Sequence, residues 1–377
     1  MTDAATGSRL GGRVAIVARA LADRPARRVE PIEPRRVLIA HHLLLGDTLM
    51  LTALCAKLRA NHPDADIAMT VPRAAAPLYA TRPYGVRALA WDPRDVPAAL
   101  FREKPFDLAF VPGDNRHAWL AAAMRARWIV AFDGDTPAHK SWPVDRLVRY
   151  PDVPGSWGDM VARLAEGPPA PQYAPSQWPS APAEPFAVPR DAFAVLHLGA
   201  STPLKLWTPD RWRAIATRLA ARGIEPVWSA GRGEDALVQA VDPDARWRSY
   251  AGALDLAQMR ALLDRARLLV SPDTGIAHLA RIAGTPSVTL YGPGSATITG
   301  AGRFYAAIPW RAVAVDPFPC RDQQVLFRRE IAWVRRCGRS TAECARPRCM
   351  DAIDVDAVSQ AIDAVLARPD PRAAGTR

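Results

Sequence analysis

The chain has 377 residues, which is too long for one ordinary hydrophobic core and predicts about two domains. Hydrophobic residues make up 49% of it, so folding is expected, and its most apolar windows are far shorter than the roughly 20 residues that span a bilayer. The formal net charge of +11 favours an anionic partner such as a nucleotide, a phosphorylated glycan, nucleic acid or a lipid surface.

Residues 1–36 form a basic leader that is rich in Arg and Ala. Its first residues, MTDAATGSRL, lack the apolar core of a signal peptide, which predicts a cytoplasmic protein. From Leu10 to Leu21 the apolar residues fall on one helical face, a pattern typical of a basic interfacial helix. A solvated and partly disordered leader is the other interpretation.

From Val37 onward, short apolar runs alternate with helical patterns, which indicates repeated βα units. We expect a first Rossmann-like domain over residues 37–166 that holds the acceptor. Its predicted elements are strands at 37–40, 67–71, 108–111 and 128–132, and a helix at 48–60.

Residues 167–190 are dense in Pro and Ala and are predicted to be an interdomain linker. A second Rossmann-like domain is expected at 191–350, followed by a C-terminal helix and tail at 351–377. The expected architecture is two doubly wound α/β domains, whose ligands bind beyond the carboxyl ends of the strands in a shared cleft. The predicted elements are strands at 193–198, 225–229, 268–270 and 287–291, and helices at 209–222 and 256–266.

The loop HHLLLGDTLM, residues 41–50, follows the first strand. Gly46 permits a tight turn, and Asp47 stands at or next to the start of the following helix. Asp47 is either the N-cap of that helix or a carboxylate suited to take a proton from a hydroxyl nucleophile.

The loop GASTPLKLWTPDRW follows the strand at 193–198. Gly199 lets the backbone approach a ligand, Ser201 and Thr202 offer hydroxyls, and Lys205 is a cation at the strand end. This set suits phosphates, whereas the alternative is a surface lysine beside a helix that Thr208 caps.

The loop AGRGEDA follows the next strand and matches a dinucleotide fingerprint at Gly231, Gly233 and Ala236. The acidic residue that should lie about 20 positions further on has only loose candidates, such as Asp255. The match is therefore weak.

The segment SPDTGIAHLA, residues 271–280, closes another strand. If a helix begins at Thr274 or Gly275, its free amides and its dipole suit a diphosphate. Asp273 is then placed to accept from a sugar hydroxyl or to orient Lys205, and His278 to donate to a phosphate. The alternative is that Asp273 caps the helix and His278 is an ordinary core histidine.

Four of the five cysteines, Cys320, Cys337, Cys344 and Cys349, lie close together in the sequence. Four thiolates suit a structural zinc or iron ion, and neighbouring arginines would offset their charge. No C-x-x-C pair is present, so reduced or buried cysteines are the other interpretation.

From Val37 to about Leu366 the chain resembles the glycosyltransferase family 9 heptosyltransferases. The resemblance lies in LLGDTLMLTAL, HLGASTPLKLWTPDRW, SPDTGIAHLARIAGTPSVTLYGP and CMDAIDVDAV, in that order and with similar spacing. It implies a two-domain GT-B fold, an ADP-heptose donor, inversion at the anomeric carbon, and no cofactor for catalysis.

The resemblance also implies roles for individual residues. Asp47 matches the general base, Lys205 matches the cation that meets the departing diphosphate, and Ser201 with Thr202 occupies the phosphate-contacting turn. The donor-binding motif of the family falls on Asp273, Thr274, Gly275 and His278.

The loop before Gly46 departs from the family. His41 takes the place of a Lys or Arg there, and Leu43 and Leu44 replace small polar residues. His41 and Gly46 are the expected acceptor contacts. The implied acceptor is a phosphorylated, lipid-linked glycan of the lipopolysaccharide core at the inner face of the inner membrane. No nucleic-acid partner is expected.

The resemblance also bears on the cysteines. A family branch that glycosylates autotransporter proteins carries a four-cysteine iron site, which favours a metal at the cysteines.

The leading hypothesis is transfer of heptose to an inner-core sugar. Another acceptor, such as an autotransporter protein, or another sugar is an alternative within the same family. A nucleotide-dependent oxidoreductase that uses the AGRGEDA loop and a non-catalytic nucleotide-sugar-binding protein are the alternatives outside it.

Overall fold

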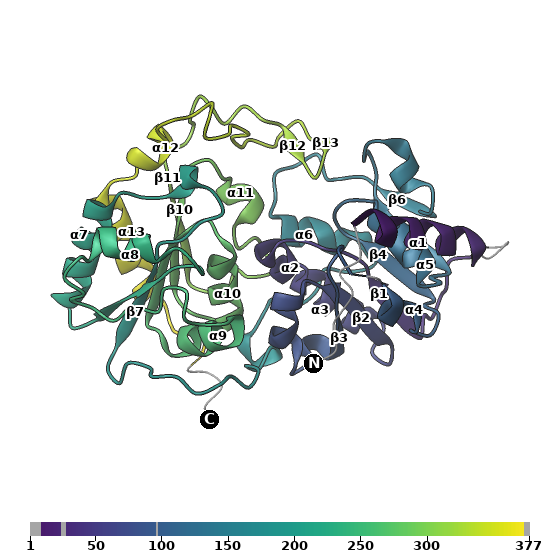
Figure 1. Cartoon of the computed structure of the whole chain (residues 1–377), viewed down its shortest axis with the longest axis horizontal. Coiled ribbons are helices and arrows are strands. Elements are labelled where there is room, and N and C mark those ends of the chain that lie inside the picture. The colour runs from purple at the N-terminus through teal and green to yellow at the C-terminus, as the bar shows by residue number, and fades with distance from the viewer. Residues whose placement is uncertain (1–8, 24–27, 96, 373–377) are drawn as a thin grey trace. The chain divides into compact units, whose positions relative to one another are not determined.

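The computed structural model describes residues 9–23, 28–95 and 97–372 of the chain. They fall into two compact units (Figure 1). Unit 1 comprises residues up to Val153 together with Gly158–Pro171 and Val325–Ala332. Unit 2 comprises Pro154–Trp157, Gln172–Gln324 and the residues from Trp333 onward.

Unit 1 is built on a six-stranded parallel sheet with the order β3-β2-β1-β4-β5-β6. The chain runs outward from β1 through β2 to β3 and then returns to place β4 on the other side of β1. The order therefore reverses between β1 and β4, which is where ligands bind in doubly wound sheets. The strands are β1 Arg36–Ile39, β2 Asp66–Val71, β3 Val86–Ala90, β4 Leu108–Val111, β5 Trp128–Phe132 and β6 Arg146–Val148.

The helix predicted at 48–60 is two helices divided at Leu51. The Thr52 hydroxyl donates to Leu49 O at 2.6 Å and occupies a carbonyl of the preceding helix, and hydroxyls used in this way bend helices. The helices associated with unit 1 are α1 Arg9–Ala22, α2 Leu45–Met50, α3 Thr52–Asn61, α4 Ala98–Phe101, α5 His117–Ala123 and α6 Trp157–Val161, with 3₁₀ turns at Arg73–Tyr79, Pro83–Gly85, Ala138–Ser141 and Ala162–Leu164.

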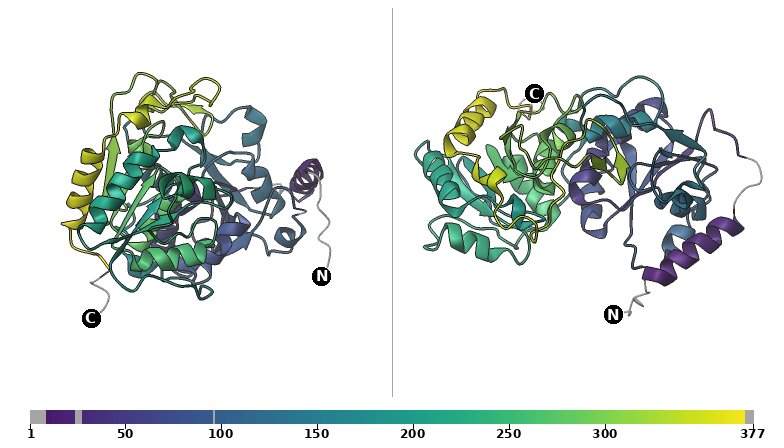
Figure 2. Two further views of the ribbon diagram at one scale, coloured as in Figure 1. Left: turned by 60° about the vertical axis from the view of Figure 1, so that its left-hand side comes forward. Right: turned by 90° about the horizontal axis from the view of Figure 1, so that it is seen from above.

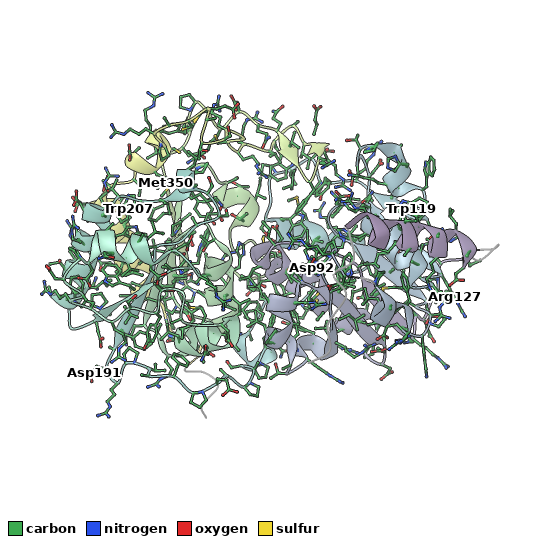
Figure 3. The ribbon with its side chains drawn as sticks, in the orientation of Figure 1. Asp92, Trp119, Arg127, Asp191, Trp207 and Met350 are labelled. Atoms are coloured by element: carbon green, nitrogen blue, oxygen red, sulfur yellow. The ribbon has the colours of Figure 1, made fainter. Side chains whose placement is uncertain are left out.

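The described part of the basic leader is helical, as the periodicity predicts. α1 packs on α5, with Ala20 buried in the core cluster that also holds Phe106 and Leu120. Trp119 of α5 packs against the same cluster (Figure 3), and α1 lies on the outside of unit 1 (Figure 2). No helix among the described residues is long and apolar enough to cross a bilayer.

Unit 2 is built on a five-stranded parallel sheet with the order β11-β10-β9-β7-β8. β7 pairs with β8 on one side and with β9 on the other, so the strand order reverses between β7 and β9. The strands are β7 Phe193–His197, β8 Glu225–Ser229, β9 Leu268–Pro272, β10 Ser287–Tyr291 and β11 Trp310–Ala314.

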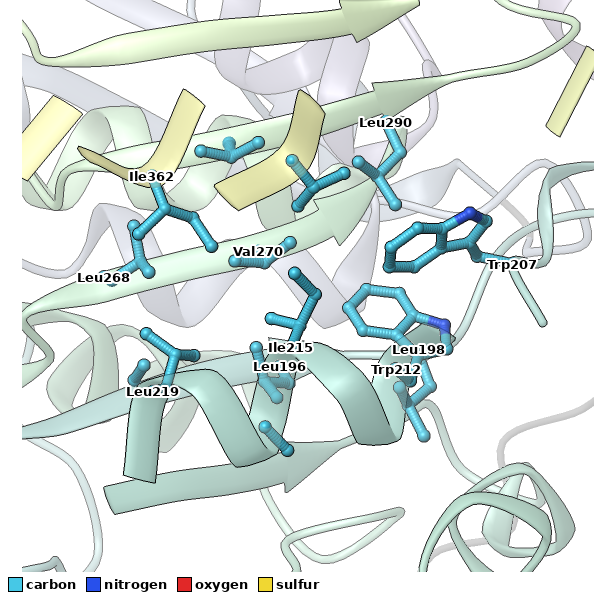
Figure 4. Packing of buried hydrophobic residues seen from close by; sticks show 14 of the residues in the cluster. Leu196, Leu198, Trp207, Trp212, Ile215, Leu219, Leu268, Val270, Leu290 and Ile362 are labelled. Atoms are coloured by element: carbon cyan, nitrogen blue, oxygen red, sulfur yellow. The ribbon is translucent and has the colours of Figure 1, made fainter. Parts of the chain in front are cut away.

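The core of unit 2 lies between this sheet and the helices that cover it (Figure 4). Trp207 and Trp212 meet edge to face with ring centroids 5.3 Å apart. The Trp207 indole also donates to Ile353 O at 3.0 Å, and Met350 is buried in the same cluster (Figure 3). The helices are α7 Pro209–Ala220, α8 Asp235–Val241, α9 Leu256–Arg265, α10 Gly275–Ala283, α11 Ala296–Thr299, α12 Arg348–Asp351 and α13 Val355–Leu366, with 3₁₀ turns at Pro175–Gln177 and Pro203–Lys205.

The Pro-rich stretch 167–190 forms no strand and only one 3₁₀ turn, and the chain passes from unit 1 to unit 2 at Pro171. Most of the stretch is packed against unit 2. The Tyr173 hydroxyl donates to Ile282 O at 2.7 Å, and Trp178 is 2% exposed. Buried aromatic residues between the prolines hold this segment on the surface of unit 2.

Residues 325–332 lie within the range that the sequence assigns to the second domain, yet they cluster with unit 1. They contain a hairpin of two short strands, β12 Val325–Leu326 and β13 Arg329–Glu330 (Figure 1). The cause is Arg329, which is 3% exposed and bonded to the loops that follow β4 and β5.

Candidate functional site

The switch point of unit 2 holds an ion pair between a lysine and an aspartate. Lys205 ends the 3₁₀ turn that follows β7, and the Thr202 hydroxyl caps this turn by accepting from Leu204 N at 3.4 Å. The Lys205 ammonium donates to Asp273 Oδ2 at 2.9 Å and to Asp273 O at 2.8 Å. Ser201, on the same loop, is exposed.

Asp273 follows β9 directly and is 8% exposed. Its second carboxylate oxygen accepts from the Thr299 hydroxyl at 3.0 Å. A Cβ at Gly294 would lie 2.4 Å from Asp273 Oδ2, so only glycine lets the loop after β10 approach this carboxylate. Both oxygens of Asp273 thus have partners, and the residue orients Lys205 rather than capping the next helix.

That helix is α10, which begins at Gly275 with Thr274 as its N-cap. The Thr274 side chain makes no capping bond, and its buried hydroxyl has no hydrogen-bond partner among the described residues. The first amides of a helix lack intrahelical acceptors and carry the positive end of its dipole. α10 therefore presents amides and a hydroxyl beside the Lys205 ammonium, a set that fits an anion.

His278, one turn into α10, is 5% exposed. Burial lowers its pKa well below the ordinary value, and the nearby Arg281 and Lys205 cations lower it further. The neutral ring places Nδ1 at 3.5 Å from Arg281 Nη1. Since the guanidinium only donates, the proton of the ring belongs on Nε2.

The weak dinucleotide fingerprint is occupied by a side chain of its own loop. Glu234 accepts from Gly231 N at 2.6 Å, so this carboxylate takes the amide that a pyrophosphate would use. A Cβ at Gly199 would lie 1.9 Å from Glu234 Oε2. Gly199 therefore accommodates Glu234 at this point, and the loop does not offer the amide cradle of a dinucleotide site.

The switch point of unit 1 holds the loop between β1 and α2, with Asp47. α2 begins at Leu45, so Asp47 lies in its first turn, half-buried, and Leu44 is the N-cap. Gly46 is also helical and does not have the positive φ of a tight turn. Both expectations about this turn are corrected for the same reason, because the helix starts at Leu45, three residues before the predicted start at Thr48.

His41 is wholly buried at the end of β1. Its Nδ1 accepts from Leu43 N at 3.2 Å, and its backbone exchanges two hydrogen bonds with the Thr70 hydroxyl. Burial, followed by the nearby His117 and His42, lowers its pKa well below the ordinary value. In this structure the neutral ring shapes the loop that carries Asp47.

The four C-terminal cysteines do not form a metal-binding group. Among the described residues no set of three or more His, Cys, Asp or Glu side chains lies in a metal-ligating arrangement. Cys320, Cys337 and Cys349 are near enough to interact with one another. Cys337 is also 3.9 Å from Arg339 Nη1, and the Cys344 thiol donates to Arg346 O at 3.4 Å. Burial raises the pKa of Cys320 and Cys349, which keeps these thiols protonated.

Two residues at the unit 2 switch point were not among the site residues that the sequence predicts. Thr299 lies on α11, after the glycine-rich end of β10, and Glu234 lies in the fingerprint loop. The fold topology could have indicated both residues, because the loops that follow parallel strands all lie at the same edge of the sheet.

A family model described as glycosyltransferase family 9 (heptosyltransferase) matches residues 99–316, more than half of the chain. The chain belongs to glycosyltransferase family 9. The match covers strands β4, β5 and β6 of unit 1 and the whole of the unit 2 sheet, including Lys205 and Asp273.

Two curated relatives are similar to this family 9 chain. Lipopolysaccharide heptosyltransferase 1 of Pseudomonas aeruginosa is 30% identical over 125 residues, 30% of this chain and 33% of that protein. The alignment thus spans about a third of the relative's length. Lipopolysaccharide heptosyltransferase 3 of Escherichia coli K12 is 25% identical over 280 residues, 66% of this chain and 79% of that protein.

Solved structures share the fold. E. coli ADP-heptose lipopolysaccharide heptosyltransferase II superposes with a TM-score of 0.67 at 18% identity, covering 88% of this chain and 98% of that one. The iron-containing dodecameric glycosyltransferase TibC from enterotoxigenic E. coli has a TM-score of 0.54 at 15% identity, covering 90% of this chain and 78% of that one. The GT-B fold that the sequence predicts is confirmed.

Proposed function

We propose that this chain is an inverting glycosyltransferase that moves heptose from ADP-heptose to an inner-core sugar of lipopolysaccharide without a catalytic metal. Family membership and the names of the curated relatives support the class of reaction. The observation that carries the proposal is the Lys205–Asp273 pair beside the open N-terminus of α10, at the switch point of unit 2.

In this proposal the donor diphosphate binds at that switch point. Lys205 meets the negative charge that grows on the departing ADP, and the first amides of α10 and the Thr274 hydroxyl meet its phosphate oxygens. Ser201, Thr202 and Gly275 line the same edge, and neutral His278 donates from Nε2. Asp273 keeps the ammonium in place through its two bonded oxygens.

Asp47 is the proposed general base. An acceptor hydroxyl oxygen forms a bond to the anomeric carbon, the bond between that carbon and the diphosphate oxygen breaks, and the hydroxyl proton passes to the Asp47 carboxylate. Attack from the side opposite the leaving group inverts the centre. The position of Asp47 at the switch point of unit 1, half-buried in the first turn of α2, supports this role.

We further propose that α1 binds the anionic surface of the membrane that carries the acceptor. Val14 and Leu21 are 60% and 61% exposed and Val17 is 39% exposed, although α1 already buries its opposite face on α5. Arg13 is also exposed, and the net charge of the chain is +11. An apolar stripe beside basic side chains fits an anionic lipid surface.

The proposal is tested with the purified chain, ADP-heptose and core glycans extracted from a strain that lacks the corresponding gene. Asp47→Asn should lower kcat by roughly 10²- to 10⁴-fold, because a positioned base contributes that much. Binding of ADP, measured by calorimetry, should change less than about twofold, because the proposal places the donor diphosphate at the switch point of unit 2 and Asp47 in unit 1. Transfer should persist in EDTA.

Unchanged turnover in Asp47→Asn would refute the assignment of the base. Mass spectrometry of the product decides the acceptor and the sugar. Transfer to a protein but not to the core glycan would favour the other acceptor within the family.

A further inference from the structure

The hairpin β12–β13 lies over the switch point of unit 1. A Cβ at Gly113, in the loop after β4, would lie 2.9 Å from Leu43 Cδ2 and 3.8 Å from Phe327 Cδ1. Leu43 belongs to the loop that carries Asp47, and its carbonyl accepts from the Thr48 hydroxyl at 3.3 Å. The tip of the hairpin is therefore packed beside the loops that follow β1 and β4, between which the strand order reverses.

A single buried arginine holds the hairpin there. Arg329 Nε donates to Asp133 O at 2.7 Å, and Nη1 donates to Gly113 O at 3.1 Å and to Phe327 O at 2.9 Å. Nη2 donates to Asn115 Oδ1 at 2.7 Å and to Phe132 O at 3.1 Å. All five N–H groups of the guanidinium thus have acceptors, which is the full capacity of this side chain.

The two residues at the tip are in a conformation that their side chains disfavour. Phe327 and Arg328 have φ values of 47° and 65°. Two-residue hairpin turns of this kind usually contain Asn and Gly, since other residues strain the backbone in the left-handed region. Retained strain of this kind is found at binding sites, where the surroundings hold it in place.

The strained tip carries a half-buried aromatic ring and an exposed cation. Arg328 is exposed and has no ion-pair partner among the described residues, whereas exposed Arg116 nearby is paired with Asp114. Leu44 is 75% exposed on the neighbouring loop. A ring and an aliphatic side chain suit the face of a sugar, and an unpaired guanidinium suits a carboxylate or a phosphate.

We infer that Phe327 and Arg328 form a binding site for the acceptor, in which Arg328 binds an anionic group on the acceptor sugar. The inference rests on the proposed function, because it places the acceptor beside Asp47. The same chemistry accommodates a sugar carboxylate or a sugar phosphate.

The test compares Arg328→Ala with Arg127→Ala in the full chain. Arg127 is a matched control, since it is exposed but lies before β5, at the opposite edge of the same sheet (Figure 3). Arg328→Ala should raise the KM for the acceptor roughly tenfold, the scale of one charge-assisted hydrogen bond, with the KM for ADP-heptose and kcat within about twofold. Arg328→Lys should restore part of the loss, and Arg127→Ala should match the wild type.

A second variant tests the strain independently. Replacing Phe327 by Asn together with Arg328 by Gly gives the turn its preferred residues, so the chain should unfold at a higher urea concentration while the KM for the acceptor rises. Core glycan from which phosphates have been removed separates the two anions. If the effect of Arg328→Ala disappears with that glycan, Arg328 binds a phosphate, and if it persists, Arg328 binds a carboxylate.

Equal KM values for the acceptor in Arg328→Ala and Arg127→Ala would overturn the inference. Its failure is distinguishable from that of the proposed function. If the wild type transfers nothing, binding of a fluorescent core glycan to the wild type and to Arg328→Ala tests the site alone, and equal binding again overturns it.

Discussion

At the residue scale, Lys205 and Asp273 form one ion pair but differ in their exposure and in their number of partner residues. The carboxylate side chain is 10% exposed and the ammonium side chain 20%, and only the carboxylate has a second partner, Thr299. The carboxylate is thus the fixed member of the pair. The lysine, whose side chain is the more exposed, is the member that can meet a diphosphate while it stays bonded to the carboxylate.

We therefore expect Lys205→Met and Asp273→Asn to lower turnover by different amounts. Lys205→Met should lower kcat with ADP-heptose by roughly 10²- to 10³-fold, because it removes a charge that stabilises the developing anion. Asp273→Asn keeps the cation but loses its orientation, so turnover should fall less. Steady-state kinetics measure both, with urea unfolding as the control for folding. If Asp273→Asn loses more turnover than Lys205→Met, the assignment of the leaving-group cation to Lys205 is wrong.

Only some contacts of the unit 2 site could be predicted from the sequence. The spacing of Lys205 and SPDTG after two strands predicts that both lie at one sheet edge, which the structure has. Thr299 follows Asp273 by 26 positions and reaches it through the turn of α11, so no local pattern indicates the contact. The position of Glu234 was also not predictable. Its carboxylate accepts from Gly231 N in a space that exists because Gly199, which follows another strand, has no side chain.

At the element scale, strands were predictable where an apolar run is bounded by turn residues. β4, β5, β8 and β10 have the predicted bounds. The hairpin β12–β13 was not predictable, because its strands have two residues each and its turn, Phe-Arg, lacks the usual Asn-Gly signal. Tertiary contacts of Arg329 create it, and such contacts leave no mark on local periodicity.

α1 provides a prediction about an element. Val17→Glu combined with Leu21→Glu places two charges on the exposed apolar stripe and leaves the buried Ala20 unchanged. Binding to vesicles that contain phosphatidylglycerol should weaken at least about tenfold, since each apolar side chain is worth roughly 1.5 kcal/mol or more when buried. Co-sedimentation with vesicles measures it, and binding should also weaken as salt increases.

The control for this experiment is Val153→Glu, which adds a charge at a 60% exposed valine outside α1. It should bind vesicles like the wild type. If the double variant also binds like the wild type, α1 does not dock on the membrane. If instead it dissociates an oligomer in sedimentation velocity, the stripe is a contact between copies of the chain.

At the scale of the whole molecule, both units repeat one arrangement. Each has a parallel sheet whose strand order reverses once, and each places its candidate residues in the loops beside that reversal: Asp47 in unit 1, and Lys205 with Asp273 in unit 2. The alternation of strands and helices in the sequence predicts the fold class. It does not predict that residues 325–332 belong to unit 1, since that assignment follows from the bonds of one arginine.

The two units also share a dependence on pH, because each buries neutral histidines. Burial lowers the pKa of His197 in unit 2 to about 4. It also lowers the pKa of His117 in unit 1 to about 4, although the nearby Asp114 acts in the opposite direction. An unfolded histidine has a pKa of about 6.5, so between pH 6.5 and 4 the unfolded chain binds protons that the folded chain does not. Within this range, the free energy of unfolding should therefore fall by about 1.4 kcal/mol for each pH unit by which the pH is lowered, for each such residue.

Urea unfolding at a series of pH values between 8 and 4.5 measures this dependence. Above pH 7 the two histidines are neutral in both states and contribute no slope. His197→Gln should reduce the slope of the unit 2 transition below pH 6.5, and His117→Gln should reduce that of unit 1. A wild-type stability that stays level from pH 7 to 5, or slopes that neither substitution changes, would show that these rings accept protons in the folded chain.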